Sequence, residues 1–228
     1  MKLCFDGFGS PVEINKGHVA SLEIESEVLF ARVCQSLSSK LGIDAVEPYT
    51  LWNDGDTELK PSNSIQYVID PFNLPWDERG LAGGLDERIE RIVFEDDIVR
   101  TRLERAASEI EQIAASASLQ MNSDYAFAVE WDLRRYLKTF GFGVEKVENE
   151  KLLDSLIRFC QYVEDARYSG LLVFVNLRYF LKENDLKSFV EQAIFSNLHV
   201  LLLNAGLSGS TVPFERKYVI DQQLLENW

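Results

Sequence analysis

Residues 170–204, GLLVFVNLRYFLKENDLKSFVEQAIFSNLHVLLLN, contain two apolar runs separated by an amphipathic segment. The runs LLVFVNL and HVLLLN lack the polar alternation of a half-exposed strand, which is typical of strands covered on both faces. The segment DLKSFVEQAIFSN between them has helical spacing, so the stretch predicts a strand–helix–strand unit of a parallel sheet. The first run ends at Asn176, where a nucleotide-hydrolysing strand usually carries a metal-binding acid.

The sequence before and after this unit continues the mixture of strands and helices. A helix is predicted from Ser26 to Gly42, because apolar residues recur at helical spacing, Ser26 can cap the start and Gly42 can end it. Short apolar runs between turn residues predict further strands. These runs lie in residues 2–7, 10–14 and 18–26, in two segments around the turn at 54–56, and in residues 217–221.

A long helical region interrupts this pattern. Residues 85–119 contain no proline or glycine and would form a rod of about 50 Å at ~1.5 Å per residue, which is too long to lie wholly on a small domain. Two further helices are predicted, one within VEWDLRRYLKTFG and one from Lys151 to Ala166. The sequence therefore predicts a helical leg at 85–166, inserted between the two parts of a head at 1–84 and 167–228.

Composition limits the kinds of partner. The formal net charge of -14 argues against broad attraction to phosphate backbones or anionic lipid, so any nucleic-acid contact must be local. The three cysteines are far apart and form no CxxC pair, which favours a reducing cytoplasm over a disulfide framework or a zinc site. No apolar run approaches the ~20 residues of a membrane helix, so no membrane partner is expected.

Catalytic motifs are missing from the sequence. No GxxxxGK[ST] loop occurs, and Asn176 cannot offer magnesium a carboxylate, so the predicted sheet lacks the parts needed for phosphoryl transfer. The glycine-rich segments LAGGLDE and AGLSGST are interpreted as hinges or loops. The only two histidines, His18 and His199, lie in no catalytic motif. We therefore assign no catalytic residue, and predict that His199 has a structural role.

Basic residues on the predicted leg are the candidates for a local anionic-ligand surface. The same spacing also suits solvated ion pairs, because Glu87 lies four residues before Arg91 and Glu109 four residues after Arg105. Phosphate binding requires several copies of this surface to face one duplex. The candidates are Arg88, Arg91, Arg102 and Arg105 on the first helix, and Arg134, Arg135 and Lys138 on the second.

Carboxylates gather in two segments, Glu95–Asp97 and, more loosely, Asp124, Glu130 and Asp132. A hard cation such as Ca²⁺ needs ~6–8 oxygen ligands, which two segments could share with carbonyls and water. The EF-hand pattern is absent, and a solvated helix face explains the same residues. A metal-dependent nuclease or nucleotide hydrolase that uses these carboxylates is the alternative functional hypothesis.

The order of elements resembles the CRISPR-associated spacer-acquisition proteins of type II-A systems. The resemblance is clearest in residues 170–204 followed by ERKYVIDQQLLEN, because that family also has an apolar strand ending in asparagine, a polar helix, a Leu/Val strand and a closing Tyr-apolar-Ile-Asp segment. Three further segments support the resemblance: VEINKGHVASLEIESEVLFARVCQSL, LKPSNSIQYVIDPFNL and WDLRRYLKTFGFGVE. None of these segments is a catalytic signature.

The resemblance implies an α/β fold: an ATPase-like head with a mostly parallel sheet that lacks a phosphate-binding loop, and an inserted helical leg. It implies a homotetrameric ring whose positively lined hole binds and encircles linear double-stranded DNA at its ends. It also implies Ca²⁺ near the head–leg junction, which points to Asp124, Glu130 and Asp132, although the preceding ASASLQMNSDYAFAV is poorer in acids than is usual for the family. The implied partners are the integrase pair of CRISPR adaptation and the RNA-guided effector nuclease.

The sequence thus predicts a non-enzymatic, sequence-nonspecific DNA-end-binding ring protein of CRISPR adaptation. Two alternatives stay open at this point. One is the carboxylate-dependent nuclease or hydrolase, and the other is a scaffold that never touches nucleic acid.

Overall fold

The computed structural model describes the chain except for residues 146, 209, 223–225 and 228. Two sheets form within the described residues. The smaller one has the order β2-β1-β4-β5 and the larger one the order β10-β9-β3-β8-β7-β6. The strands of the smaller sheet are β1 (Lys2–Phe5), β2 (Val12–Glu13), β4 (Tyr49–Trp52) and β5 (Glu58–Leu59). Those of the larger sheet are β3 (Val19–Ile24), β6 (Ile65–Val68), β7 (Leu171–Val175), β8 (His199–Ala205), β9 (Glu215–Ile220) and β10 (Glu226–Asn227).

The strand–helix–strand prediction for residues 170–204 is confirmed. β7 and β8 pair in parallel, with Leu171 opposite His199, and α7 (Glu183–Phe195) connects them after the short 3-10 helix η2 (Leu177–Tyr179). The strands β6, β7, β8, β3 and β9 all run parallel, which makes the larger sheet mostly parallel as predicted. Both faces of this sheet are covered, which explains why the two apolar runs show no alternation.

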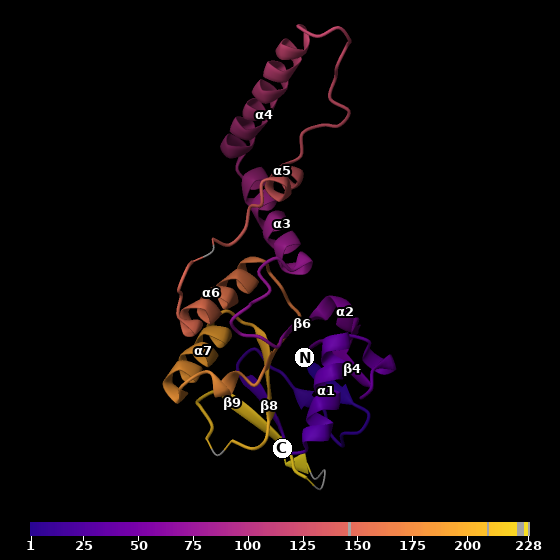
Figure 1. Ribbon diagram of the computed structural model, residues 1–228, viewed down its shortest axis with the longest axis vertical. Helices are drawn as coiled ribbons and strands as arrows, with labels where there is room; N and C mark the ends of the chain where they lie inside the picture. The colour runs from indigo at the N-terminus through magenta and orange to yellow at the C-terminus, as the bar shows by residue number, and fades with distance from the viewer. Residues whose placement is uncertain (146, 209, 223–225, 228) are drawn as a thin grey trace.

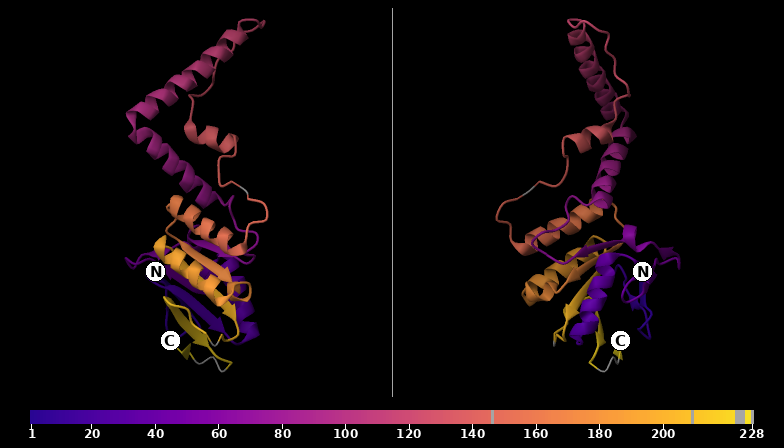
Figure 2. Two further views of the ribbon diagram at one scale, coloured as in Figure 1. Left: turned by 90° about the vertical axis from the view of Figure 1, so that its left-hand side faces the viewer. Right: turned by 45° about the vertical axis from the view of Figure 1, so that its right-hand side comes forward.

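Two apolar cores lie on opposite faces of the larger sheet. One core packs Leu172, Phe174 and Leu202 against α6 (Leu152–Asp165) and α7. The other packs residues such as Val173 against α1 (Glu27–Ser39) and the smaller sheet. Figures 1 and 2 show α6 and α7 on one side of the larger sheet and α1 on the other. Alternate residues of each strand face opposite cores, so the sheet is buried on both sides.

The helix predicted from Ser26 to Gly42 is present with a different end. The Ser26 hydroxyl accepts a hydrogen bond from the Leu29 backbone N–H, as predicted for a cap. The helix ends at Ser39, where Lys40 takes the left-handed conformation at φ 55°, so Gly42 does not end it. Gly42 instead begins the 3-10 helix η1 (Gly42–Asp44) at φ 63°. The short helix α2 (Pro61–Ser64) precedes β6.

The predicted rod at 85–119 is bent into two helices. α3 (Arg79–Glu95) and α4 (Asp97–Ser118) meet at Asp96, whose backbone is extended at φ -103° and ψ 107°. The Asp96 carboxylate accepts hydrogen bonds from the Ile98 and Val99 backbone N–H groups, so it caps α4 as a separate helix. α5 (Leu133–Thr139) packs beside α3. Figure 2 shows the bend and the extension of α4 away from the head.

The third helix assigned to the leg by sequence lies in the head. Leu156, Phe159 and Val163 of α6 are buried in the core that α7 shares. The boundary predicted at residue 166 therefore assigns α6 to the leg, although α6 packs in the core of the head. From here on, the leg means α3 to α5, residues 79–139, and the head means the two sheets with α1, α2, α6 and α7.

Candidate nucleic-acid interface

The place where an ATPase would bind phosphate is closed by the local sequence. Only Glu25 and Ser26 connect β3 to α1. Ser26 caps the helix, the Glu25 carboxylate accepts a hydrogen bond from the Gln222 backbone N–H at 3.1 Å, and Glu27 adds a second carboxylate in the first turn. A two-residue connection leaves no loop to surround a phosphate, and the carboxylates oppose an anion at this helix start.

Asn176 supports the backbone at the end of β7. It takes the left-handed conformation at φ 53°, which asparagine adopts more readily than most residues. Its Oδ1 accepts a hydrogen bond from the Ala205 backbone N–H at 2.8 Å, and its own N–H donates to the Leu203 carbonyl at 2.8 Å. The side chain that stands at the position of a metal-binding acid therefore ties the end of β7 to the end of β8.

Three of the seven predicted DNA-binding cations are paired with carboxylates. Arg88 on α3 bonds to Asp165 at the end of α6 at 2.7 Å, so it links leg and head. Arg134 on α5 donates from Nε to Glu90 on α3 at 2.7 Å. Arg91 pairs with Glu87 at 3.3 Å, as the spacing predicted. These side chains hold helices in place or are neutralised locally.

The other four cations are exposed and have no ion pair within the part of the chain that the structure describes. They are Arg102 and Arg105 on α4, and Arg135 and Lys138 on α5. The predicted pair of Arg105 with Glu109 does not form among these residues. Residues of both helices, including Ile110 and Arg135, line one surface hollow, so α4 and α5 share a side of the leg. We call these four residues the free basic set.

The leg also exposes many large apolar side chains. Among them are Ile92, Ile98, Ile110, Ile113, Leu119, Phe127 and Val129. The few buried apolar residues of the leg are Leu81, Ala107, Leu133 and Leu137. An apolar surface of this extent is typical of a contact with another protein chain.

The predicted calcium ligands do not meet. Asp132 caps α5, because its Oδ1 accepts a hydrogen bond from the Arg135 backbone N–H at 2.7 Å. Asp124 and Glu130 are exposed on the segment between α4 and α5. Among the described residues, no three His, Cys, Asp or Glu side chains are grouped to hold a metal ion. These three residues therefore do not fit a calcium site in the single chain. For the same reason they do not form the metal centre that the nuclease hypothesis requires of them.

The segment Glu95–Asp97 is explained by helix geometry and an ion pair. Asp96 caps α4, and Asp97 pairs with Arg100 at 2.8 Å. These carboxylates stabilise the start of a helix, where negative charge is favourable.

His199 is structural, as the sequence predicted. It begins β8 and is only 5% exposed. Its Nε2 lies 3.6 Å from Asp54 Oδ2, and burial lowers the pKa of the imidazole below its ordinary value. His18 lies exposed in a turn, where its backbone N–H donates to the Asn15 carbonyl.

Comparison with known proteins identifies the family. The family model described as CRISPR-associated protein (Cas_Csn2) matches residues 43–224. The chain belongs to the Csn2 family. The family resemblance inferred from the order of strands and helices is therefore confirmed, and membership in the Csn2 family supports a role in CRISPR adaptation.

One solved structure shares the fold. The crystal structure of Stu0660 of Streptococcus thermophilus matches with a TM-score of 0.65 and 18% identity, over 100% of this chain and 76% of that one. A putative ABC transporter ATP-binding protein from Pyrococcus furiosus matches with a TM-score of 0.41 and 12% identity, over 95% of this chain and 97% of that one. A search of curated protein sequences gives no match. Among the described residues, no helix is both long and apolar enough to cross a membrane.

Proposed function

We propose that this Csn2-family chain is a non-enzymatic, sequence-nonspecific protein that binds the ends of double-stranded DNA during spacer acquisition in the cytoplasm. The observation that carries the proposal is the free basic set, whose four cations lie exposed and without ion pairs among the described residues. Such cations can release the counterions of a phosphate backbone without first breaking an internal bond.

The overall negative charge is compatible with this function if copies of the chain assemble. At physiological salt, charges more than about 8 Å apart are largely screened, so basic patches inside a ring act on DNA while acids face outward. Four copies that bind one duplex together gain affinity from effective concentration. The exposed apolar residues of the leg support self-association, and we propose a homotetrameric ring whose positively lined hole encircles the duplex.

Calcium and the adaptation partners stay predictions from the family resemblance. A mass measurement of the assembly with and without Ca²⁺ tests the first, and a smaller mass after chelation is the expected result. Co-purification with the integrase pair or the RNA-guided effector nuclease tests the second.

The free basic set can be tested against a paired arginine on the same helix. We expect Arg102→Ala with Arg105→Ala to weaken binding of linear duplex about tenfold or more at low salt, and to reduce the salt slope by ~0.9 for each phosphate that is no longer neutralised. Arg100→Ala is the matched control, because Arg100 pairs with Asp97 at 2.8 Å and Glu104 at 3.7 Å. Equal affinity of the double variant and the wild type would reject this surface.

Two further measurements separate the alternative functions. A mobility assay across a salt series compares linear with circular duplex, because a closed ring threads only onto an open end; a pure scaffold binds neither. Incubation with labelled linear DNA, ATP and divalent ions tests the nuclease and hydrolase hypothesis, and we expect no turnover.

A further inference from the structure

A row of buried polar side chains crosses one face of the larger sheet near the carboxyl ends of its strands. Glu23 of β3 is 0% exposed and Asn204 of β8 is 3% exposed, and Ser21 lies buried between apolar neighbours on β3. The core on this face is otherwise apolar. Burying a carboxylate and an amide in such a core is costly unless their polar atoms are paired. The Glu23 carboxylate is paired, because the Ser208 backbone N–H donates to it at 2.9 Å and Lys217 lies beside it, so Asn204 is the residue of this row that keeps an unpaired atom.

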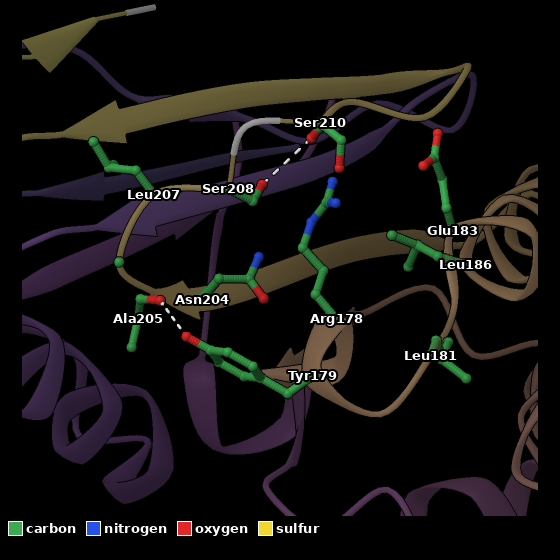
Figure 3. A pocket seen from close by; sticks show the side chains of 11 residues that line it. Arg178, Tyr179, Leu181, Glu183, Leu186, Asn204, Ala205, Leu207, Ser208 and Ser210 are labelled. Atoms are coloured by element: carbon green, nitrogen blue, oxygen red, sulfur yellow. Dashed lines mark hydrogen bonds between the residues drawn. The ribbon is translucent and has the colours of Figure 1, made fainter.

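A cavity of about 330 Å³ opens beside this row, at the ends of β7 and β8 (Figure 3). Its lining includes Arg178, Tyr179, Leu186 and Asn204. In open α/β sheets, ligands bind outside the carboxyl ends of the strands, near the point where the strand order reverses. The chain passes here from β8 to β9 on the far side of β3. The volume lies within the ~300–1,000 Å³ of small-molecule sites.

Ion pairs hold most of the charged groups around the cavity. Arg178 forms an ion pair with Glu215. The Lys217 ammonium lies 3.2 Å from the Glu23 carboxylate and donates to the Ser208 carbonyl at 2.8 Å. Glu23 and Glu215 thus offset Arg178 and Lys217, and Glu183, which also lines the cavity, adds a third carboxylate. A phosphate would meet the carboxylates, and a metal ion would meet an ammonium that already occupies the oxygen ligands, so neither is favoured.

Two polar atoms at the cavity are left unpaired. The Asn204 amide donates from Nδ2 to Ser21 Oγ at 3.2 Å, but its Oδ1 has no hydrogen-bond partner among the described residues. Within the same residues, Arg178 Nε makes no hydrogen bond, and the Glu23 carboxylate oxygen lies 4.0 Å away. Figure 3 shows the Asn204 amide and the Arg178 side chain on adjoining sides of the cavity. The cavity therefore offers the Asn204 acceptor and the Arg178 donor to a ligand, in addition to the Glu183 carboxylate in its lining.

The remaining wall combines apolar and aromatic side chains with the polar residues Glu183, Ser208 and Ser210. Leu181 and Leu186 line one side of the cavity. Tyr179 is 71% exposed at its rim, and its hydroxyl donates to the Ala205 carbonyl at 3.0 Å, which fixes the ring. An aromatic ring held at the rim of a cavity can stack on a flat ligand.

We propose that this cavity binds a nucleobase, going beyond the proposed function in DNA-end binding. A nucleobase is planar and uncharged, and its edge carries an amino or imino donor for Asn204 Oδ1 beside a ring-nitrogen or keto acceptor for Arg178 Nε. The base can come from a free nucleoside or from an unpaired nucleotide at a DNA strand end. Because the carboxylates around the cavity outnumber the cations, the phosphate groups of a nucleotide should not strengthen binding.

Titration of the full chain with adenosine, guanosine, cytidine and thymidine, followed by calorimetry or ligand-observed NMR, tests the proposal. At least one nucleoside is expected to bind saturably with one site per chain, and ATP is expected to bind no more than tenfold tighter than adenosine. Absence of saturation by all four nucleosides overturns the proposal. A larger preference for ATP would overturn the neutral-ligand class, because it would indicate recognition of phosphate.

Variants locate the site. Asn204→Leu keeps the branched shape of the side chain but removes the acceptor, and nucleoside binding at least tenfold weaker than in the wild type is expected; unchanged binding overturns the assignment. Because this variant also breaks the bond to Ser21, Tyr179→Ala at the exposed rim is the second variant, with several-fold weaker binding expected. Phe195→Ala is the matched control, since this aromatic residue is 77% exposed at the end of α7.

Competition separates the two sources of the base. A duplex with a single-stranded overhang that displaces the nucleoside identifies the strand end, whereas displacement by nucleosides alone identifies a free ligand. Asn204→Leu should still bind blunt duplex through the free basic set, so a failure of the cavity proposal is distinct from a failure of DNA-end binding. An overhang effect that persists in Asn204→Leu would contradict the role of the cavity.

Discussion

The head and the leg use similar kinds of residues in opposite ways. In the head, apolar side chains fill both faces of the larger sheet, and charged groups such as Glu23, Arg178 and Lys217 are paired internally. In the leg, isoleucines and phenylalanines are exposed, and the free basic set has no ion pair within the described residues. The head therefore pairs its charged groups and buries its apolar side chains within the chain. The leg instead exposes cations and apolar side chains that a bound partner can contact.

The difference separates what holds the fold from what contacts other molecules. Truncating a buried side chain of the head removes packing that no solvent replaces, whereas truncating an exposed side chain of the leg changes little in the isolated chain. Changes in the leg should instead affect assembly and DNA binding. The free energy of unfolding should respond accordingly, from a large loss in the core of the head to a small one at a single titrating group.

The largest effect is expected in the core between the larger sheet and its helices. Phe174 lies edge-on to Phe159 and Phe189 there, with ring centroids 6.5 and 5.2 Å away. Phe174→Ala should lower the free energy of unfolding by about 3–5 kcal/mol, because it leaves a cavity. Urea denaturation measures the loss. Ile113→Ala on the leg, exposed in the chain, is the comparison and should cost less than about 0.5 kcal/mol; equal losses would contradict the contrast.

A smaller loss is expected at the end of β7. Asn176→Ala removes the acceptor of the Ala205 N–H and places alanine at φ 53°, so it should cost about 1–3 kcal/mol. Asn176→Asp keeps an acceptor oxygen and should cost less. Thermal unfolding compares the two variants. If Asp and Ala cost the same, the hydrogen bond to Ala205 is not what stabilises this turn.

In the leg, the bend should depend on the cap of α4. Asp96→Ala removes the acceptor of the Ile98 and Val99 N–H groups and should cost about 0.5–2 kcal/mol. It should also allow α3 and α4 to straighten, which small-angle X-ray scattering detects as a larger maximum dimension. Asp96→Asn retains capping and is the control. An unchanged scattering curve for Asp96→Ala would show that other contacts set the bend.

The smallest effect concerns pH and His199. Burial lowers the pKa of His199, so below its unfolded pKa of ~6.5 the unfolded chain binds a proton more readily than the folded chain. Stability should therefore be fully present above that pH and fall as the pH drops below it. Asp54 faces the imidazole, and its pKa is lowered chiefly through a hydrogen bond from the N-terminal ammonium. Its contribution to the stability of the fold is therefore also lost as the pH falls.

The contribution of His199 is isolated by substitution. His199→Gln should flatten the decline of stability between neutral and mildly acidic pH, measured by urea denaturation at several pH values. His18→Gln changes an exposed histidine and should leave the decline as it is. The same slope in both variants would assign the decline to the carboxylates.

Much of the head could be predicted from sequence because its pattern is local. The apolar runs that became β7 and β8 carry no alternation, and a helix of fitting length lies between them. The polar row was not predicted, because Ser21 and Glu23 alternate with apolar residues, a pattern that also suits a half-exposed strand. Only the pairing of β3 with β8 and β9 shows that both faces are covered.

The leg was harder to predict because its decisive contacts join distant residues. Arg88 and Asp165 are separated by 77 positions, and Arg134 and Glu90 by 44, so helical spacing cannot show these ion pairs. The bend at Asp96 occurs in a run without glycine or proline, where capping by aspartate is the only sequence signal. The amphipathic pattern of α6 indicates a buried face but not the core that buries it.

The two-residue connection between β3 and α1 also limits how this chain could change. A phosphate-binding loop of the GxxxxGK[ST] type is eight residues long, so single substitutions in a two-residue connection cannot create one here. Only an insertion of several codons would do so, and it would have to displace Ser26 and Glu25 from the bonds they make to Leu29 and Gln222. The length of this connection therefore prevents substitutions alone from making the chain a nucleotide-driven machine, whatever side chains they introduce.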